Sequence, residues 1–239
     1  MTLGRLGAAA VAAALALAGA PVAAAPPKPE AKPEAKPEAN GDDPPAGLVS
    51  GEPARGAALD PVFAHFKLER LACTFREDKR IALLARPLHT TGAIYYARDR
   101  GIARETRTPR PERVVVTRTA LRIRKGDHVE DIPLDKSKDL KAFALIFPTI
   151  LRGERGELER AFEIGLYGGD AAWWALVFTP KAGSMRALVR RVVVFGRKDQ
   201  LVALQVVEAS GDTTDTHLAD VRRNGDVPDA EITAAFGAP

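Results

Sequence analysis

The sequence has little of what catalytic and metal-binding sites need. It contains one cysteine, Cys73, which excludes an intramolecular disulfide. Its four histidines lie in separate segments without the spacing of metal ligands: His65, His89, His128 and His217. None of its serines stands in the Gly-x-Ser-x-Gly context of a hydrolase nucleophile. We therefore expect no enzyme, no metal site and no cofactor.

The sequence also has no large excess of charge of one sign. The chain has 35 Lys and Arg against 31 Asp and Glu, a net charge of +4, which is too small to indicate a nucleic-acid partner. Arginines nevertheless gather in one stretch. They form the solvent face of a half-buried sheet or attract anionic lipid headgroups, and both interpretations remain open for Arg98, Arg100, Arg104, Arg107, Arg110, Arg113, Arg118, Arg122 and Arg124.

The first residues have the three parts of a secretory signal peptide. Arg5 is followed by an apolar stretch to about Ala20, then by Pro21 and small residues. The apolar run is shorter than the ~20 residues that span a bilayer, which argues against an uncleaved anchor. We expect cleavage after Ala24, with residues 1–24 as the signal peptide, and a periplasmic mature protein.

A second segment cannot build a core. Residues 28–39 are three copies of Lys-Pro-Glu-Ala, in which proline at every fourth position favours an extended, solvated chain. We predict a disordered spacer over residues 25–58 and one folded domain over residues 59–239. Deletion of residues 26–56 is then expected to leave the melting temperature nearly unchanged.

The folded part shows mainly strand patterns. Asp60 as the N-cap and Pro61 at the first helical position predict the start of a short helix. Alternating apolar residues then predict about ten consecutive antiparallel strands, over residues 71–76, 88–98, 102–108, 112–119, 121–125, 162–167, 173–179, 187–195, 201–209 and 213–222. A long antiparallel sheet of this size tends to curl into a barrel or half barrel.

One helical segment interrupts the strands. Between Asp139 and Leu151 the apolar residues follow a helical stripe, with some excess beyond one face. Pro148 should kink or split this helix, and residues 157–162 predict a further short turn of helix. The segment is apolar enough to cover another apolar surface.

Isolated polar and thiol groups have ordinary interpretations. Cys73 alternates onto the apolar side of its strand, which predicts a buried structural thiol. Glu69, Glu77 and Asp78 are flanked by basic residues, which predicts a solvated charged face. Neither set indicates catalysis.

Several local strings, in this order and spacing, resemble the periplasmic lipoprotein carriers called LolA and their relatives. They are Phe75-Arg76-Glu77 before Arg86-Pro87-Leu88, Gly92-Ala93-Ile94-Tyr95-Tyr96-Ala97-Arg98, Pro109, residues 174–181, residues 206–208 before 211–213, and residues 227–230 with Phe236. The resemblance covers residues 59–236. It implies a mainly β fold: an N-terminal helix, a strongly curved antiparallel half barrel and a helical lid over an apolar cavity.

The resemblance also implies site residues. In the family, an arginine at the place of Arg98 reaches toward the lid helices and holds the cavity shut. We predict a lid of Phe143, Ile146, Phe147 and Ile150, and a cavity lined by Ile94, Tyr96, Phe178, Val192, Val194, Leu204 and Val206, although core packing would give the same pattern. The chain departs from the family at Arg104, where an aromatic residue is common.

Two functions follow from the resemblance. The first is a monomeric periplasmic carrier that shields the acyl chains of a lipoprotein or lipid between an inner-membrane release complex and an outer-membrane acceptor. The second is a regulatory module of the same fold that senses lipid or protein.

Overall fold

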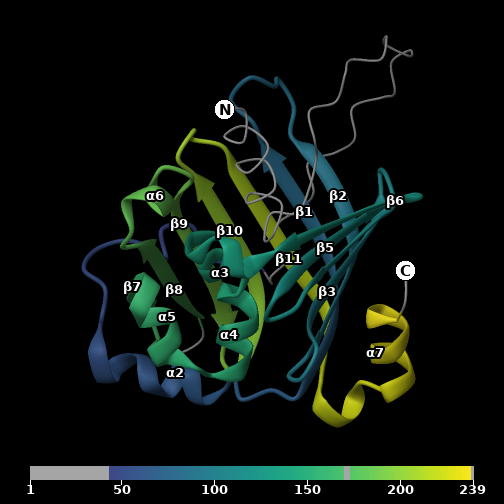
Figure 1. The fold of residues 1–239 in the computed structure, drawn as a ribbon. Coiled ribbons are helices and arrows are strands. Elements are labelled where there is room, and N and C mark those ends of the chain that lie inside the picture. Colours follow the sequence, from purple (N-terminus) through teal and green to yellow (C-terminus); the bar gives the residue numbers. More distant parts are fainter. Residues whose placement is uncertain (1–42, 170–172, 238–239) are drawn as a thin grey trace.

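The sheet is a single antiparallel layer that curves around a group of short helices (Figure 1). This computed structural model describes residues 43–169 and 173–237, so the expected signal peptide and the Lys-Pro-Glu-Ala repeats lie outside the described residues. Within them the sheet has eleven strands in the order β6-β5-β4-β3-β2-β1-β11-β10-β9-β8-β7. The prediction of a mainly β, strongly curved antiparallel fold is confirmed.

The strands follow the predicted rhythm with small shifts at their ends. They are β1 (Arg70–Arg80), β2 (Leu88–Ala97), β3 (Gly101–Thr108), β4 (Glu112–Val116), β5 (Ala120–Lys125), β6 (His128–Pro133), β7 (Phe162–Gly168), β8 (Trp173–Pro180), β9 (Val189–Arg197), β10 (Gln200–Glu208) and β11 (Thr213–Arg223). Ten of them match the expected strands.

The eleventh strand is β6, which the sequence did not predict. Its side chains are almost all exposed, so it lacks the alternation that indicates a half-buried strand. It pairs with β5 at the edge of the sheet, where Asp131 lies opposite Arg122 and accepts two hydrogen bonds from its guanidinium, at 2.6 and 2.9 Å. Cross-strand charge pairing substitutes here for apolar contact.

The helices are short. They are α2 (Asp60–Ala64), α3 (Lys138–Ala144), α4 (Ile146–Arg152), α5 (Arg155–Ala161), α6 (Gly183–Arg186) and α7 (Asp229–Phe236), with 3₁₀ turns η1 (Gly56–Leu59), η2 (Leu134–Lys136) and η3 (Asn224–Asp226). The sequence did not predict α6 and α7. At α2 the N-cap is Leu59 rather than Asp60, because η1 leads directly into the helix.

The predicted split of the central helix occurs at Leu145, between α3 and α4. Pro148 lies three residues further on and has no N–H to donate to the carbonyl of Ala144, and its ring crowds that carbonyl. The chain therefore leaves the helical path at Leu145, where ψ is 1°. We call α3 and α4 together the lid.

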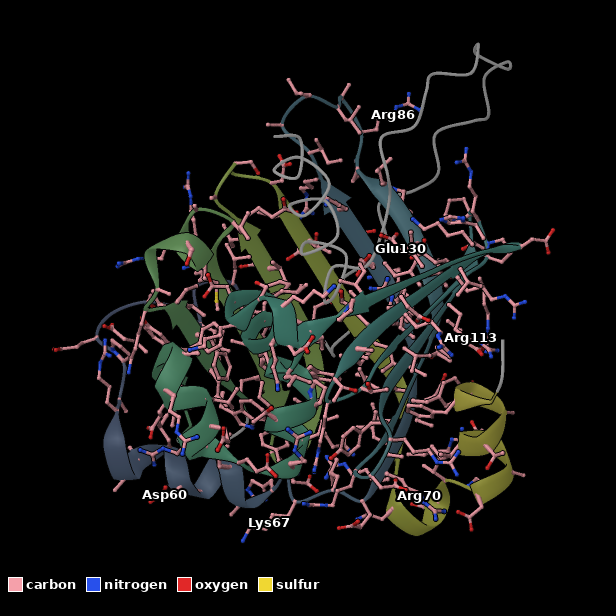
Figure 2. The ribbon with its side chains drawn as sticks, viewed as in Figure 1. Asp60, Lys67, Arg70, Arg86, Arg113 and Glu130 are labelled. Carbon is pink, nitrogen blue, oxygen red and sulfur yellow. The ribbon has the colours of Figure 1, made fainter. Side chains whose placement is uncertain are left out.

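The two faces of the sheet are covered differently. The lid and α5 lie on the concave face, while α7 lies on the outer side near β2 and β3 (Figure 1). Val227 and Ile232 pack there against Ala72 and Ala97. Arg70, labelled beside α7 in Figure 2, donates to the Val227 carbonyl at 3.1 Å and pairs with Asp229.

The folded part begins earlier than the expected boundary at residue 59. Leu48 and Val49 pack on the outer face of the sheet against Ala175, Val177 and Val193. Ala54 exchanges two backbone hydrogen bonds with Leu166 of β7, at 2.8 and 2.9 Å. Residues 43–58, which we assigned to the spacer, thus form part of the domain, because they cover an apolar strip that the sheet would otherwise expose.

This contact changes the expectation for the spacer. Deletion of residues 26–42 is expected to leave the melting temperature unchanged. Deletion of residues 26–56 exposes the strip under Leu48 and Val49, which costs about 2 kcal/mol and lowers the melting temperature by roughly 4–8 °C. Differential scanning fluorimetry of both variants beside the mature protein makes the comparison. Equal melting temperatures for the two deletions would contradict it.

Candidate functional site

The concave face and the lid share one apolar core. It contains all the residues predicted to line a cavity and all those predicted to form the lid. Each of them is at most 6% exposed. Alternation along the strands places Ile94, Tyr96, Leu204 and Val206 on this face. These residues are therefore buried in the core, and the division of this core into cavity and packed interior depends on packing.

A small cavity of about 30 Å³ remains between the sheet and the lid. Of the predicted residues, Ile94, Leu204 and Phe147 line it. The rest of its wall comes from β3, β4, β11 and the lid: Ile102, Arg104, Val114, Val116, Ala144, Pro148 and Thr216. The other predicted lining residues pack directly against neighbouring side chains, so the interior is nearly filled in this closed form.

The lid is fastened at its two ends. Just before it, the N–H of Leu134 donates to the Thr119 carbonyl at 2.8 Å. In its last turn, the Leu151 carbonyl accepts from the N–H of Leu68 at 2.9 Å. Between these points, no hydrogen bond or ion pair within the described part of the chain joins residues 138–150 to the sheet. Among the described residues, apolar contact alone holds the middle of the lid.

A buried ion pair lies in the wall of this interior, and here the sequence interpretation was wrong. Glu77, expected on a solvated face, is 3% exposed, and Arg104 is 4% exposed. The guanidinium donates through Nη1 and Nη2 to the two carboxylate oxygens of Glu77, at 2.9 and 3.0 Å. The alternation of Leu71, Cys73 and Phe75 already placed Glu77 on the inner face, but the basic residues around it hid that signal.

Neighbouring groups complete the surroundings of the pair. Thr216 and Thr90 donate to the Glu77 carboxylate at 2.8 and 3.2 Å, and the Phe75 ring centroid lies 4.1 Å from the Arg104 guanidinium carbon. The carboxylate thus accepts four hydrogen bonds. Arg104 Nε and Thr214 Oγ1 are buried without a hydrogen-bond partner among the described residues.

Arg98 lies just beyond β2 and is half-buried. Its Nε is 2.8 Å from Oε1 of Glu69, and its N–H donates to the Glu69 carbonyl at 2.9 Å. Within the described residues, its guanidinium donates no hydrogen bond to a lid carbonyl. Burial raises the pKa of Tyr96 to about 12, and the charges of Arg152, in the lid, and of Arg98 both oppose this rise. Arg98 and the end of the lid thus face the same tyrosine.

The arginines predicted to form a positive face lie partly in ion pairs. Arg113, Arg118, Arg122 and Arg124 line an open groove of about 610 Å³ on the outer side of the sheet. There Arg122 pairs with Asp131, and Arg113 pairs with Glu105. Pairing of this kind favours the interpretation as a solvent face.

Other candidate chemistry is sparse. Cys73 is buried as predicted, and burial raises the pKa of its thiol to about 12, so it stays protonated at neutral pH. Residues 43–169 and 173–237 contain no cluster of three or more His, Cys, Asp or Glu side chains arranged to hold a metal ion. None of the helices in these ranges is long and apolar enough to cross a membrane.

The chain was compared with curated proteins, solved structures and protein families. No curated protein matches the sequence. A LolA superfamily protein from Nitrosomonas europaea is 12% identical, with a TM-score of 0.41 over 74% of this chain and 97% of that one. A DUF1329 family protein from Desulfovibrio piger is 14% identical, with a TM-score of 0.42 over 74% and 98%. The structure of the MucA/MucB complex of Pseudomonas aeruginosa is 10% identical, with a TM-score of 0.43 over 76% of this chain and 59% of that one.

The family model describing the outer membrane lipoprotein carrier protein LolA-like group matches residues 54–236. The match covers the curved sheet, the lid and the last helix, and it begins within the N-terminal segment that packs on the sheet. The chain therefore belongs to the LolA-like family of outer membrane lipoprotein carrier proteins.

Proposed function

We propose that this domain is a monomeric periplasmic carrier. It takes up the acyl chains of a lipoprotein or lipid from an inner-membrane release complex and delivers them to an outer-membrane acceptor. The observation that carries this proposal is the lid over an apolar interior: within the described part of the chain, apolar contact alone holds its middle.

Such a lid suits exchange with an acyl chain. Transfer of one CH₂ group from water to an apolar environment gains about 0.8 kcal/mol, so an acyl chain needs an apolar container to cross an aqueous space. Phe143, Ile146 and Phe147 occupy the interior in the closed form. An acyl chain that replaces them exchanges one apolar contact for another, and no polar bond has to break in the middle of the lid.

Titration with a fluorescent acyl probe tests the proposal. The mature protein is expected to bind pyrene-dodecanoic acid in a saturable manner, and native mass spectrometry is expected to find one acyl ligand per chain. Absence of saturable binding in both measurements would contradict a carrier function.

The loop between β1 and β2 supplies the control for this titration. Leu83 is 94% exposed and Leu84 is 47% exposed, so they offer an apolar surface outside the interior. They precede Arg86, which Figure 2 labels, by three and two residues. The Leu83→Ser/Leu84→Ser variant should bind the probe as the wild type does. Loss of binding in this variant would place the probe on the loop and not beneath the lid.

Arg98 is proposed as the residue that keeps the lid closed. It binds Glu69, and the residue before Glu69 donates to the last turn of α4. The Arg98→Leu variant loosens this attachment, and because a closed lid and an acyl chain compete for one volume, retention of the probe should increase several-fold. Dissociation rates into acceptor vesicles measure the effect, with Arg100→Leu, an exposed neighbour, as the matched control. Equal rates for all three proteins would make Arg98 an ordinary surface residue.

A further inference from the structure

We propose that the interior recognises ester-linked acyl chains, with Arg104 Nε as the hydrogen-bond donor to the ester carbonyl. This inference rests on the proposed carrier function and names the chemical feature of the cargo. It depends on the one polar part of an otherwise apolar cavity wall.

The wall of the cavity has only two polar side chains among its described residues, Arg104 and Thr216. The Thr216 hydroxyl donates to Glu77. In Arg104, both terminal nitrogens also donate to Glu77, whereas Nε has no hydrogen-bond partner within residues 43–169 and 173–237. Arg104 is thus a residue of the cavity wall with one guanidinium nitrogen left for a further acceptor.

Arg104 is held rigidly in this position. Its guanidinium makes two parallel hydrogen bonds to one carboxylate and stacks on the Phe75 ring at 4.1 Å. A donor fixed in this way loses little conformational freedom when it binds an acceptor. A buried donor without an acceptor is unfavourable, so an acceptor on the cargo gains from meeting it.

The charge of the site decides which acceptor fits. Glu77 already neutralises Arg104, and a second carboxylate would leave an excess negative charge in a medium of low dielectric constant. An ester carbonyl accepts a hydrogen bond without adding charge. The neighbouring walls of Ile94, Ile102 and Val114 then receive the hydrocarbon next to that carbonyl.

Two lysolipids that differ in one group test the inference. 1-Palmitoyl-lysophosphatidylcholine has an ester carbonyl where 1-O-hexadecyl-lysophosphatidylcholine has a CH₂ group. In competition with pyrene-dodecanoic acid, below the micellar concentration of either lipid, the wild type should bind the ester roughly tenfold more tightly. This comparison needs no variant.

The Arg104→Met/Glu77→Met variant removes both charges and leaves neither unpaired, and it should bind the two lysolipids equally. The exposed pair on the outer face provides the control, because Arg122→Met/Asp131→Met should keep the tenfold preference. Equal binding of both lipids by the wild type, or a preference that survives in Arg104→Met/Glu77→Met, overturns the inference and leaves the carrier function intact. If neither lipid nor the pyrene probe binds, the carrier function itself fails.

One further competitor distinguishes a lipoprotein from a glycerophospholipid as the source of the ester. A diacylated lipopeptide of the Pam2Cys type carries ester-linked acyl chains on a glyceryl group that a thioether joins to its cysteine. Displacement of the probe by the lipopeptide at lower concentration than by the lysolipid supports the inference with a lipoprotein as cargo. The reverse order supports it with a glycerophospholipid as cargo.

Discussion

The Arg104→Met variant is expected to lose about 3–5 kcal/mol of the free energy of unfolding, because it leaves the Glu77 carboxylate buried without its countercharge. In a domain of this size, that loss lowers the melting temperature by roughly 10 °C. Thermal unfolding followed by circular dichroism measures it. The hydrogen bonds from Thr216 and Thr90 remain, but two hydroxyl donors do not replace a guanidinium.

Two companion variants show whether the loss of stability comes from the unpaired Glu77 carboxylate. Arg104→Met/Glu77→Met removes both charges and should recover most of the lost stability, since a buried ion pair and well-packed apolar residues are often close in free energy. Arg122→Met breaks the exposed pair with Asp131 and should leave the melting temperature unchanged. If Arg104→Met unfolds at the wild-type temperature, the Glu77 carboxylate is reached by solvent and the pair is not a buried one.

The Gly92→Ala variant is expected to lose about 3 kcal/mol through overpacking. A Cβ at position 92 would lie 1.9 Å from the carbonyl oxygen of Glu105 and 2.7 Å from Cε1 of Phe75. The first atom belongs to the backbone of β3 and cannot move without displacing the strand. The second belongs to the ring that stacks on Arg104, so this glycine also makes room for the support of the ion pair.

Gly156→Ala is the matched control for Gly92→Ala. Gly156 is exposed near the start of α5, and a Cβ there meets no atom within 4 Å. Alanine should stabilise the domain there by about 0.5 kcal/mol, because it restricts the unfolded chain. Chemical denaturation of both variants compares them. A Gly92→Ala variant as stable as the wild type would show that β2 and β3 can separate without cost.

The sequence alone determined which apolar residues face the interior. Side chains alternate along a strand with a period of two, so Ile94, Tyr96, Val192 and Val194 could be assigned to one face from the sequence. The helical stripe between residues 139 and 151 and the position of Pro148 likewise predicted a split apolar lid. These signals are local, because each depends on residues a few positions apart.

The tertiary structure decided how the interior is divided and where its polar part lies. Glu77 and Arg104 are 27 residues apart in the chain and meet only because β2 lies between β1 and β3 in the sheet, with Glu77 opposite Thr90 and Arg104 opposite Ile94. Likewise, the cavity lies where Phe147 and Pro148 of the lid meet residues of β2, β3 and β4. The ion pair depends on strand register, and the cavity depends on the shapes of packed side chains. No local sequence pattern encodes either of them.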